Sequence, residues 1–148
     1  VIMDEIYLGF REQAFTLKAE DINIYLENDE QVFAMIADIP IKQNIVTIFC
    51  SFDGNVSMYY SNGKFNIGLG EKEAVRKAAI SLLISSGQCL PYMNLYEDHI
   101  IDESVMQVFL FYRDGIKTKK INIKDCKTKE DKFINFLIQN ILTAIHTN

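Results

Sequence analysis

The spacing of hydrophobic and polar residues changes four times along this chain, and each change predicts a new kind of secondary structure. Residues 10–21 place Phe10, Ala14 and Leu17 at spacings of four and three among charged residues, which predicts a short amphipathic helix. Apolar and polar residues then alternate over residues 22–26, so the helix could give way to a strand there.

Residues 32–69 carry the longest β pattern of the chain. Residues 32–39 are almost all apolar, and their strand is expected to end at Pro40, which has no amide hydrogen for a neighbouring strand. Two more runs of apolar or alternating residues follow, and each ends in a dipeptide that favours a tight turn, Asp53-Gly54 and Asn62-Gly63. We therefore expect a β-meander across this segment.

Residues 71–86 return to a helical period. One face carries residues at spacings of three and four, namely Val75, Ala78, Ala79, Leu82, Leu83 and Ser86. Ile80 and Ile84 widen that apolar stripe, so this helix is expected to be buried over much of its circumference. Gly87 is expected to end it.

A second β pattern follows. Residues 105–112 are apolar at both alternating positions except Gln107, which predicts a central strand covered on both faces. Asp114-Gly115 then predicts a turn into a lysine-rich strand over residues 116–124, and lysines of this kind commonly protect the edge of a sheet.

The last helix is expected to begin at Thr128, an N-cap residue supplemented by Asp131, and to extend to Ile145. The expected order of elements is therefore α-β-β-β(-β)-α-β-β-α. The strands form an antiparallel sheet of about five to six strands, a meander plus a hairpin, with helices packed on it. This combination defines the α+β class.

Composition agrees with an ordinary globular domain, because 49% of the 148 residues are hydrophobic and 24% are charged. No repeat, linker or change of composition divides the chain, so we expect a single α+β domain over residues 3–148. Met3 is the expected initiator, with Val1 and Ile2 as a remnant before it, and we expect no signal peptide or membrane span. Three widely spaced cysteines favour a reducing, cytoplasmic location.

The glycines of residues 63–70 precede a helix, where free backbone amides can bind phosphate. Leu69-Gly70, however, occupies the positions at which a P-loop requires Lys followed by Ser or Thr. Glu71 and Glu73 in the first helical turn would also repel a bound anion. We therefore interpret these glycines as a hairpin turn and a tight connection to the helix.

Residues 89–104 predict an irregular connection that is longer than most loops in compact domains, and long loops often bind ligands. Asp38, near the end of its apolar strand, could line a pocket closed by this loop or cap the adjacent turn. A metal site at His99, Asp98 and Asp102 is less favoured because no second histidine is nearby, and we expect neither a metal nor a cofactor. The candidate binding residues of the loop are Tyr92, Tyr96, Asp98 and His99.

Charge is unevenly distributed within the net charge of -5. Residues 1–54 hold ten acids and three bases, a net charge of -7, whereas residues 113–132 hold eight bases and four acids, a net charge of +4. The simplest interpretation is a solvated strand edge and helix start. The sharper interpretation is a surface that docks a protein partner or a second copy of the chain, through Lys117, Lys119, Lys120 and Lys124. The acidic balance argues against nucleic acids and anionic membranes as partners.

The expected order of elements, with the pI near 5.0 and the size, resembles the small chaperones of type III secretion systems. The resemblance is one of topology and rests on no motif, so no binding residue carries over from that family. Because no catalytic motif is present, we expect a non-catalytic, protein-binding cytoplasmic protein of a chaperone-like or toxin-neutralising kind. The alternatives are a small-molecule-binding protein or enzyme whose pocket is closed by residues 89–104, and a structural subunit of a larger assembly.

Overall fold

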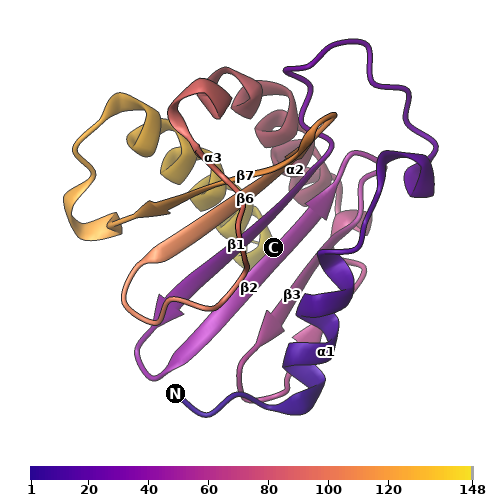
Figure 1. The fold of residues 1–148 in the computed structure, drawn as a ribbon. Helices are drawn as coiled ribbons and strands as arrows, with labels where there is room; N and C mark the ends of the chain where they lie inside the picture. Colours follow the sequence, from indigo (N-terminus) through magenta and orange to yellow (C-terminus); the bar gives the residue numbers. More distant parts are fainter. Residues whose placement is uncertain (148) are drawn as a thin grey trace.

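A seven-stranded antiparallel sheet forms the middle layer of the computed structural model, which describes residues 1–147 (Figure 1). The order across the sheet is β4-β3-β2-β1-β6-β7-β5. The expected antiparallel α+β architecture is confirmed, and the sheet exceeds the expected five to six strands because β5 adds an edge. The strands are β1 (Ala34–Ile41), β2 (Asn44–Ser51), β3 (Val56–Tyr60), β4 (Phe65–Asn66), β5 (Asn94–Leu95), β6 (Met106–Tyr112) and β7 (Gly115–Ile121).

Helices cover both faces of this sheet. The helices α2 (Glu73–Ser86) and α3 (Lys129–His146) lie side by side on one face, whereas α1 (Glu5–Ala14) lies on the other face and contacts β3 (Figure 1). Short 3₁₀ turns join the elements at Ala19–Ile22, Leu69–Glu71, Gly87–Tyr92 and Ile123–Asp125.

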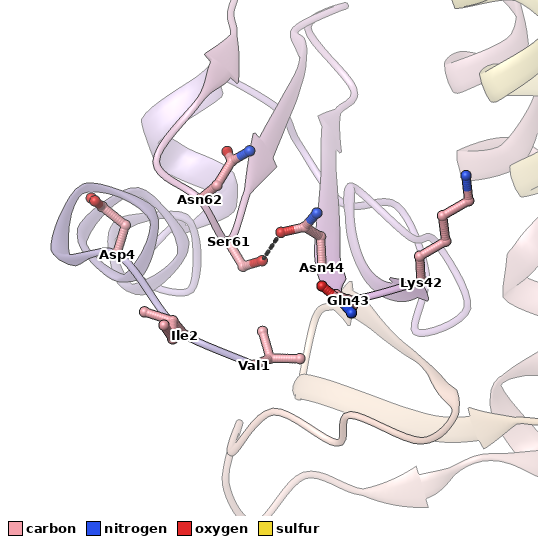
Figure 2. Close-up of a pocket in the computed structure, with 8 residues that line it drawn as sticks. All are labelled: Val1, Ile2, Asp4, Lys42, Gln43, Asn44, Ser61 and Asn62. Atoms are coloured by element: carbon pink, nitrogen blue, oxygen red, sulfur yellow. Dashed lines mark hydrogen bonds between the residues drawn. The ribbon is translucent and has the colours of Figure 1, made fainter.

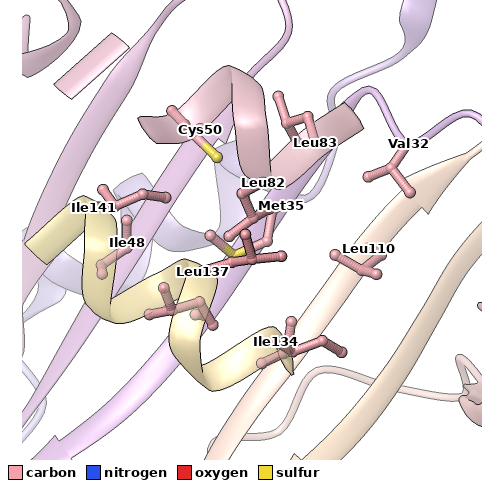
Figure 3. Packing of buried hydrophobic residues seen from close by; sticks show 14 of the residues in the cluster. Val32, Met35, Ile48, Cys50, Leu82, Leu83, Leu110, Ile134, Leu137 and Ile141 are labelled. Atoms are coloured by element: carbon pink, nitrogen blue, oxygen red, sulfur yellow. The ribbon is translucent and has the colours of Figure 1, made fainter. Parts of the chain in front are cut away.

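The main core lies between the sheet and the pair of helices α2 and α3 (Figure 3). Every second residue of the central strands points into it, including Met35, Ile48 and Leu110, and Leu82 of α2 meets them. Burial of each such side chain contributes roughly 1.5–3 kcal/mol. Cys50 belongs to the same core, and its complete burial raises the pKa of the thiol to about 12, so it is unreactive at neutral pH.

The opposite face of the sheet is covered by α1, by residues 15–26 and by residues 96–101. Its polar part holds Asp38 and Thr47. Because both faces are covered, β6 is apolar at both alternating positions, as its sequence predicts. The apolar part of this face is a cluster of Ala14, Phe33, Ala34, Ile36, Phe109 and Phe111.

Two expectations for the first third of the chain are wrong. The first helix is α1, which begins well before residues 10–21, because the carboxylate of Asp4 accepts a hydrogen bond from the Ile6 amide at 2.8 Å and caps it. Residues 22–26 form no strand. Their alternation instead reflects packing against the covered sheet face, where the partly buried side chains are Ile22, Ile24 and Leu26.

The strand β1 extends one residue beyond Pro40, which is paired with Ile45 of β2. The pairing of β1 with β6 ends at Asp38, so Pro40 has a neighbouring strand on one side only. A proline is tolerated at such an edge position because no neighbour there needs its amide hydrogen. The expectation that the strand ends at Pro40 is therefore wrong by one residue.

Glycines shape the ends of several elements. The hairpin turns at Asp53-Gly54 and Asn62-Gly63 are confirmed, and their glycines adopt φ values of +92° and +94°. Gly87 follows α2 as expected, but its φ is -57°. Its small size is needed for another reason, because a Cβ atom there would lie 2.1 Å from the carbonyl oxygen of Glu30.

The connection from α2 to β6 passes around the edge of the sheet (Figure 1). It forms the 3₁₀ turn Gly87–Tyr92 after α2, pairs with β7 as the two-residue strand β5, and then crosses the opposite face. It finally enters β6, which lies beside β1 in the centre of the sheet. The expected irregular loop over residues 89–104 is thus divided into two parts that cover different faces of the sheet.

Candidate functional site

The candidate residues of the 89–104 segment do not lie together. Tyr96 and His99 lie on the α1 side of the sheet, whereas Tyr92 lines a hollow beside α3. Asp98 is exposed and accepts a hydrogen bond at 3.1 Å from the amide two residues later in its own turn. The structure therefore brings two of the four candidates together and separates the other two from them.

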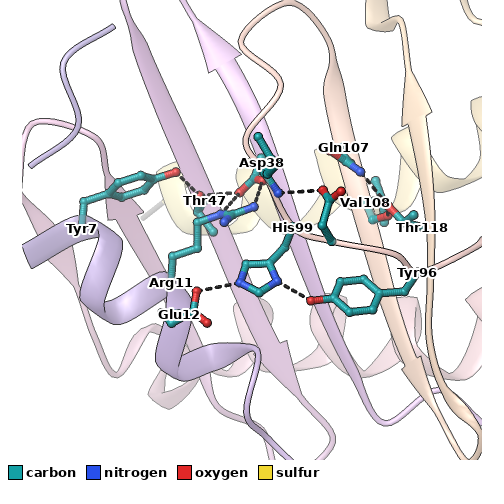
Figure 4. Close-up of polar contacts among 12 residues, drawn as sticks. Tyr7, Arg11, Glu12, Asp38, Thr47, Tyr96, His99, Gln107, Val108 and Thr118 are labelled. Carbon is teal, nitrogen blue, oxygen red and sulfur yellow. Dashed lines mark hydrogen bonds and ion pairs between the residues drawn. The ribbon is translucent and has the colours of Figure 1, made fainter. Parts of the chain in front are cut away.

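Asp38 is the centre of a buried polar cluster on the α1 side of the sheet (Figure 4). Its carboxylate accepts hydrogen bonds from Arg11 Nε at 3.1 Å and from Arg11 Nη2 at 2.6 Å. It also accepts one from Thr47 Oγ1 at 2.7 Å. Because that bond uses the only hydrogen of the Thr47 hydroxyl, Tyr7 is the donor in its 2.7 Å contact with Thr47. We call these four residues the Asp38 cluster.

Regular spacing within two elements brings the Asp38 cluster together. Tyr7 and Arg11 are one turn apart on α1 and share a face. Asp38 and Thr47 are directly opposite each other on β1 and β2. The Arg11 guanidinium also makes a cation–π contact, with its central carbon 5.0 Å from the ring centre of Phe15. Asp38 is 0% exposed and Arg11 is 4% exposed, so a dissolved ligand cannot contact this carboxylate in the structure.

The electrostatics of the Asp38 cluster favour a structural role. Burial, and then the negative charge of Asp38, raise the pKa of Tyr7 to about 12, so the phenol stays neutral. A buried ion pair adds little net stability because both charges lose water, whereas removal of one partner is strongly destabilising. The cluster therefore holds α1 in a defined position on the sheet.

A second row of polar residues lies beside the Asp38 cluster (Figure 4). It joins α1 to residues 96–102, which we call the crossing segment because they pass over this face of the sheet. His99 Nε2 lies 2.6 Å from a carboxylate oxygen of Glu12, and its Nδ1 contacts the Tyr96 hydroxyl. With its hydrogen on Nε2, the His99 ring donates to Glu12 and accepts from Tyr96. The ring also stacks on Phe15 with 4.2 Å between the ring centres.

A carboxylate, an imidazole and a hydroxyl in this order can activate a nucleophile. Burial, and then the charge of Glu12, raise the pKa of Tyr96, which opposes formation of a tyrosinate. We therefore interpret this row as structural contacts that hold the crossing segment on α1, and not as a catalytic triad. The row consists of Glu12, His99 and Tyr96.

Tyr7, Arg11 and Glu12 are not among the site residues predicted from the sequence. Their spacing could have indicated a shared role, because Tyr7, Arg11 and Ala14 are four and three positions apart and so lie on one face of α1. Asp38, inside an apolar strand, also required a cationic partner if it was buried. The sequence does not say which base supplies that partner.

A hollow of about 730 Å³ opens beside the turn between β1 and β2 (Figure 2). Asn44 lies in it and accepts a hydrogen bond from the Ser61 hydroxyl at 3.2 Å. Val1 and Ile2 form one of its walls. Most of its lining residues are exposed, and we assign no function to this hollow.

Two adjoining hollows lie at the C-terminal end of α2. One, of about 520 Å³, is lined by Tyr25 and Ile84, and the other, of about 530 Å³, is lined by Tyr92 and Phe133. Gln88 lines both hollows and therefore joins them. Tyr25, Ile84 and Tyr92 are 85%, 67% and 59% exposed. We call these five residues the α2-end surface.

The four lysines of the expected partner interface lie on or just after β7. This strand was expected at the edge of the sheet, but the short strand β5 pairs with it and forms the edge instead. Lys119 and Lys120 form ion pairs of 2.7 Å and 3.0 Å with carboxylates of α3 and of the crossing segment. Lys117 donates to a backbone carbonyl at 3.1 Å, and Lys124 is exposed. Three of the four are thus engaged within the chain, and the interface at these lysines stays a prediction.

Within residues 1–147, no group of three or more His, Cys, Asp and Glu side chains is arranged to hold a metal ion. None of the helices in this described part of the chain combines the length and apolar character needed to cross a membrane. No family model, no curated protein and no solved structure matches this chain.

Proposed function

We propose that this chain is a non-catalytic domain that binds another protein through the α2-end surface. The observation that carries the proposal is the pair of adjoining hollows bordered by three strongly exposed side chains, Tyr25, Ile84 and Tyr92. Large aromatic side chains are enriched at the centres of protein interfaces, where a few of them contribute most of the binding energy.

The α2-end surface is built from segments that pack tightly on one another. Tyr25 comes from the segment before β1, Ile84 from α2 and Tyr92 from the following 3₁₀ turn. The backbone of Gly87 lies so close to the carbonyl group of Glu30 that the first of these segments is seated against the end of α2. A preformed surface loses less conformational entropy on binding than a mobile one, which favours affinity.

Charge indicates the chemistry of the partner. Glu27 and Glu30 line the first hollow beside Tyr25. A segment with apolar or aromatic anchors next to Lys or Arg would complement both the hollows and these carboxylates. A chaperone-like or toxin-neutralising protein would use such a surface to cover an apolar, basic segment of its partner.

The alternative, a ligand pocket closed by residues 89–104, has less support. Asp38 has no exposed surface, and the pKa of Tyr96 is raised rather than lowered. A ligand would reach the Asp38 cluster only after α1 or the crossing segment had left the sheet. Either movement would break the contact of His99 with Glu12.

Site-directed photo-crosslinking in cells that naturally make the protein tests the proposal. A photoreactive amino acid is introduced at Ile84 or at Tyr92, and separately at Ile67 as a matched control. Ile67 is 62% exposed and apolar, but it does not line either hollow. We expect the same discrete protein adduct from both test positions and none from the control. Adducts of equal yield at all three positions, or none at Ile84 and Tyr92, would contradict the proposal.

The purified partner allows a quantitative test by calorimetry. Ile84→Asp and Tyr92→Ala should each weaken binding by about tenfold or more, as expected for interface anchors, whereas Ile67→Asp should leave the affinity unchanged. Equal affinities for all variants would place the interface elsewhere. An adduct with a second copy of the chain would identify self-association as the binding event and would overturn the basic partner segment.

A further inference from the structure

A separate pocket lies between the C-terminal end of α3 and the adjacent ends of β2 and β3. Its volume is about 670 Å³, which is within the range that small-molecule ligands occupy. We call it the α3-end pocket. It shares no lining residue with either hollow of the α2-end surface, so its role does not depend on the protein-binding proposal.

The walls of the α3-end pocket are mainly apolar. Val46 of β2 and Met58 of β3 are buried below it, while Tyr60 and Leu142 are partly buried and border it. Leu142 of α3 also packs against the main core. The pocket therefore opens at the end of the layer between α3 and the sheet.

The charged groups of the pocket are cationic or ionise to cations. Lys42 and His146 line it, and no aspartate or glutamate is among its lining residues, although the chain has 20 Asp and Glu in total. Lys42 is exposed at the turn between β1 and β2. An apolar pocket with a cation at its rim complements a ligand that has an apolar body and one negative charge.

The partial negative charge at the C-terminal end of α3 is partly compensated. A helix C-terminus carries partial negative charge on carbonyl groups that have no partner in the helix. Here the carbonyl of Thr143 accepts a hydrogen bond from the Thr147 hydroxyl at 2.7 Å. The carbonyl of Ala144 accepts one from the Lys72 ammonium group at 2.8 Å, which places a cation at this end of the helix.

We infer that the α3-end pocket binds a monoanionic amphiphile, such as a free fatty acid of medium chain length. The hydrocarbon chain would lie on Met58, Tyr60 and Leu142, and the carboxylate would lie at the rim beside Lys42. This assigns a ligand class to a site that is distinct from the α2-end surface.

Isothermal titration calorimetry with decanoate tests the inference, with decanol as a neutral ligand of similar size. We expect decanoate to bind the wild-type protein at least tenfold more tightly than decanol. The Lys42→Glu variant should lose about tenfold or more in decanoate affinity, because it reverses the charge at the rim. Lys64→Glu is the matched control, since Lys64 is an exposed lysine outside the pocket, and it should change the affinity by less than about twofold.

A Leu142→Gln variant tests the apolar wall independently, and it should weaken decanoate and decanol alike. Circular dichroism of each variant confirms that it is folded. Absence of decanoate binding to the wild-type protein would overturn the inference. Equal affinity for decanoate and decanol, or equal effects of Lys42→Glu and Lys64→Glu, would also overturn it.

Discussion

Asp38 is the only charged residue of β1, and its surroundings explain why the strand tolerates it. A carboxylate without exposed surface is stable only when it is hydrogen-bonded and accompanied by a cation. Arg11 supplies the charge and two hydrogen bonds, and Thr47 supplies a third. Since the buried residues of α1 are Tyr7, Arg11 and Ala14, the position of this helix depends on the Arg11–Asp38 pair.

Removal of one partner from this ion pair should be costly. Asp38→Ala leaves the Arg11 charge buried without a counterion, so we expect the free energy of unfolding in urea to fall by about 3–5 kcal/mol. The double variant Arg11→Met/Asp38→Leu removes both charges and should recover most of that loss. Asp29→Ala is the control, because it breaks an ion pair with Arg113 whose side chains are 70% and 42% exposed, and it should cost less than about 1 kcal/mol. Similar losses for Asp38→Ala and Asp29→Ala would exclude the anchoring role.

Tyr7 should make the stability of the protein depend on alkaline pH. Its pKa is raised from 10.0 to about 12 in the folded state, so the folded protein holds the phenolic proton more tightly than the unfolded chain does. The resulting stabilisation is complete below pH 10 and is lost as the pH rises through about 12. Urea unfolding between these pH values should therefore show a steeper decline for the wild type than for Tyr7→Phe. Parallel declines would show that Tyr7 titrates as in the unfolded chain.

At the scale of elements, both ends of α2 are positioned by close backbone contacts. A Cβ atom on Gly70, just before the helix, would lie 1.9 Å from the carbonyl oxygen of Gly54. A Cβ atom on Gly87, just after it, would lie 2.1 Å from the carbonyl oxygen of Glu30. Neither glycine has a positive φ, so space rather than backbone conformation requires them. Through these two contacts, one end of α2 packs against the β-meander and the other end packs against the segment that carries Tyr25.

The Gly87→Ala variant tests whether lack of space for a Cβ atom, and not backbone conformation, requires glycine at this position. Alanine is the better helix former by about 1 kcal/mol, but its methyl group would force the Glu30 backbone to move. We expect the free energy of unfolding, measured by urea denaturation, to fall by roughly 1–3 kcal/mol. Gly9→Ala in α1 is the control, because no atom lies within 4 Å of the added Cβ, and it should raise stability by roughly 0.5–1 kcal/mol. A gain in both variants would contradict the close approach at Gly87.

At the scale of the whole molecule, folding places an acidic residue of the first third of the chain next to the basic segment of residues 113–132. Arg113, at the start of the basic segment, pairs with Asp29 of the acidic first third at 2.9 Å. Lys120 is neutralised separately by Asp102, outside that third, at 3.0 Å. The separation of charge along the chain is therefore larger than the separation in space. For this reason our protein-binding proposal rests on the α2-end surface and not on the four lysines.

The two proposed binding sites lie at different ends of the helical layer. The α2-end surface includes Phe133 near the start of α3, whereas the α3-end pocket includes His146 at its end. A helix of 18 residues is about 27 Å long. A protein partner and a small amphiphile could therefore bind at the same time, and the variants that test one site leave the other intact.

Much of the secondary structure could be predicted because it depends on residues a few positions apart. The hairpin turns at Asp53-Gly54 and Asn62-Gly63 needed only the conformational freedom of their glycines. The Thr128 hydroxyl accepts a hydrogen bond from the Asp131 amide at 3.1 Å, so the start of α3 was also decided locally. Likewise, the alternation within β1 to β3 and the helical period of α2 specified which side chains face the main core.

The candidate site depends on contacts between residues that are far apart in the sequence, and the sequence alone did not indicate which residues would meet. Asp38 needed a cation, but nothing near it in the sequence indicated Arg11, which is 27 positions away on another element. The separation of Tyr92 from Tyr96 was equally hidden, because β5 turns the chain around the sheet edge between them. Secondary structure follows from short-range hydrogen bonds and side-chain periodicity. The order of strands and the face that each connection covers follow instead from burial of apolar surface contributed by the whole chain.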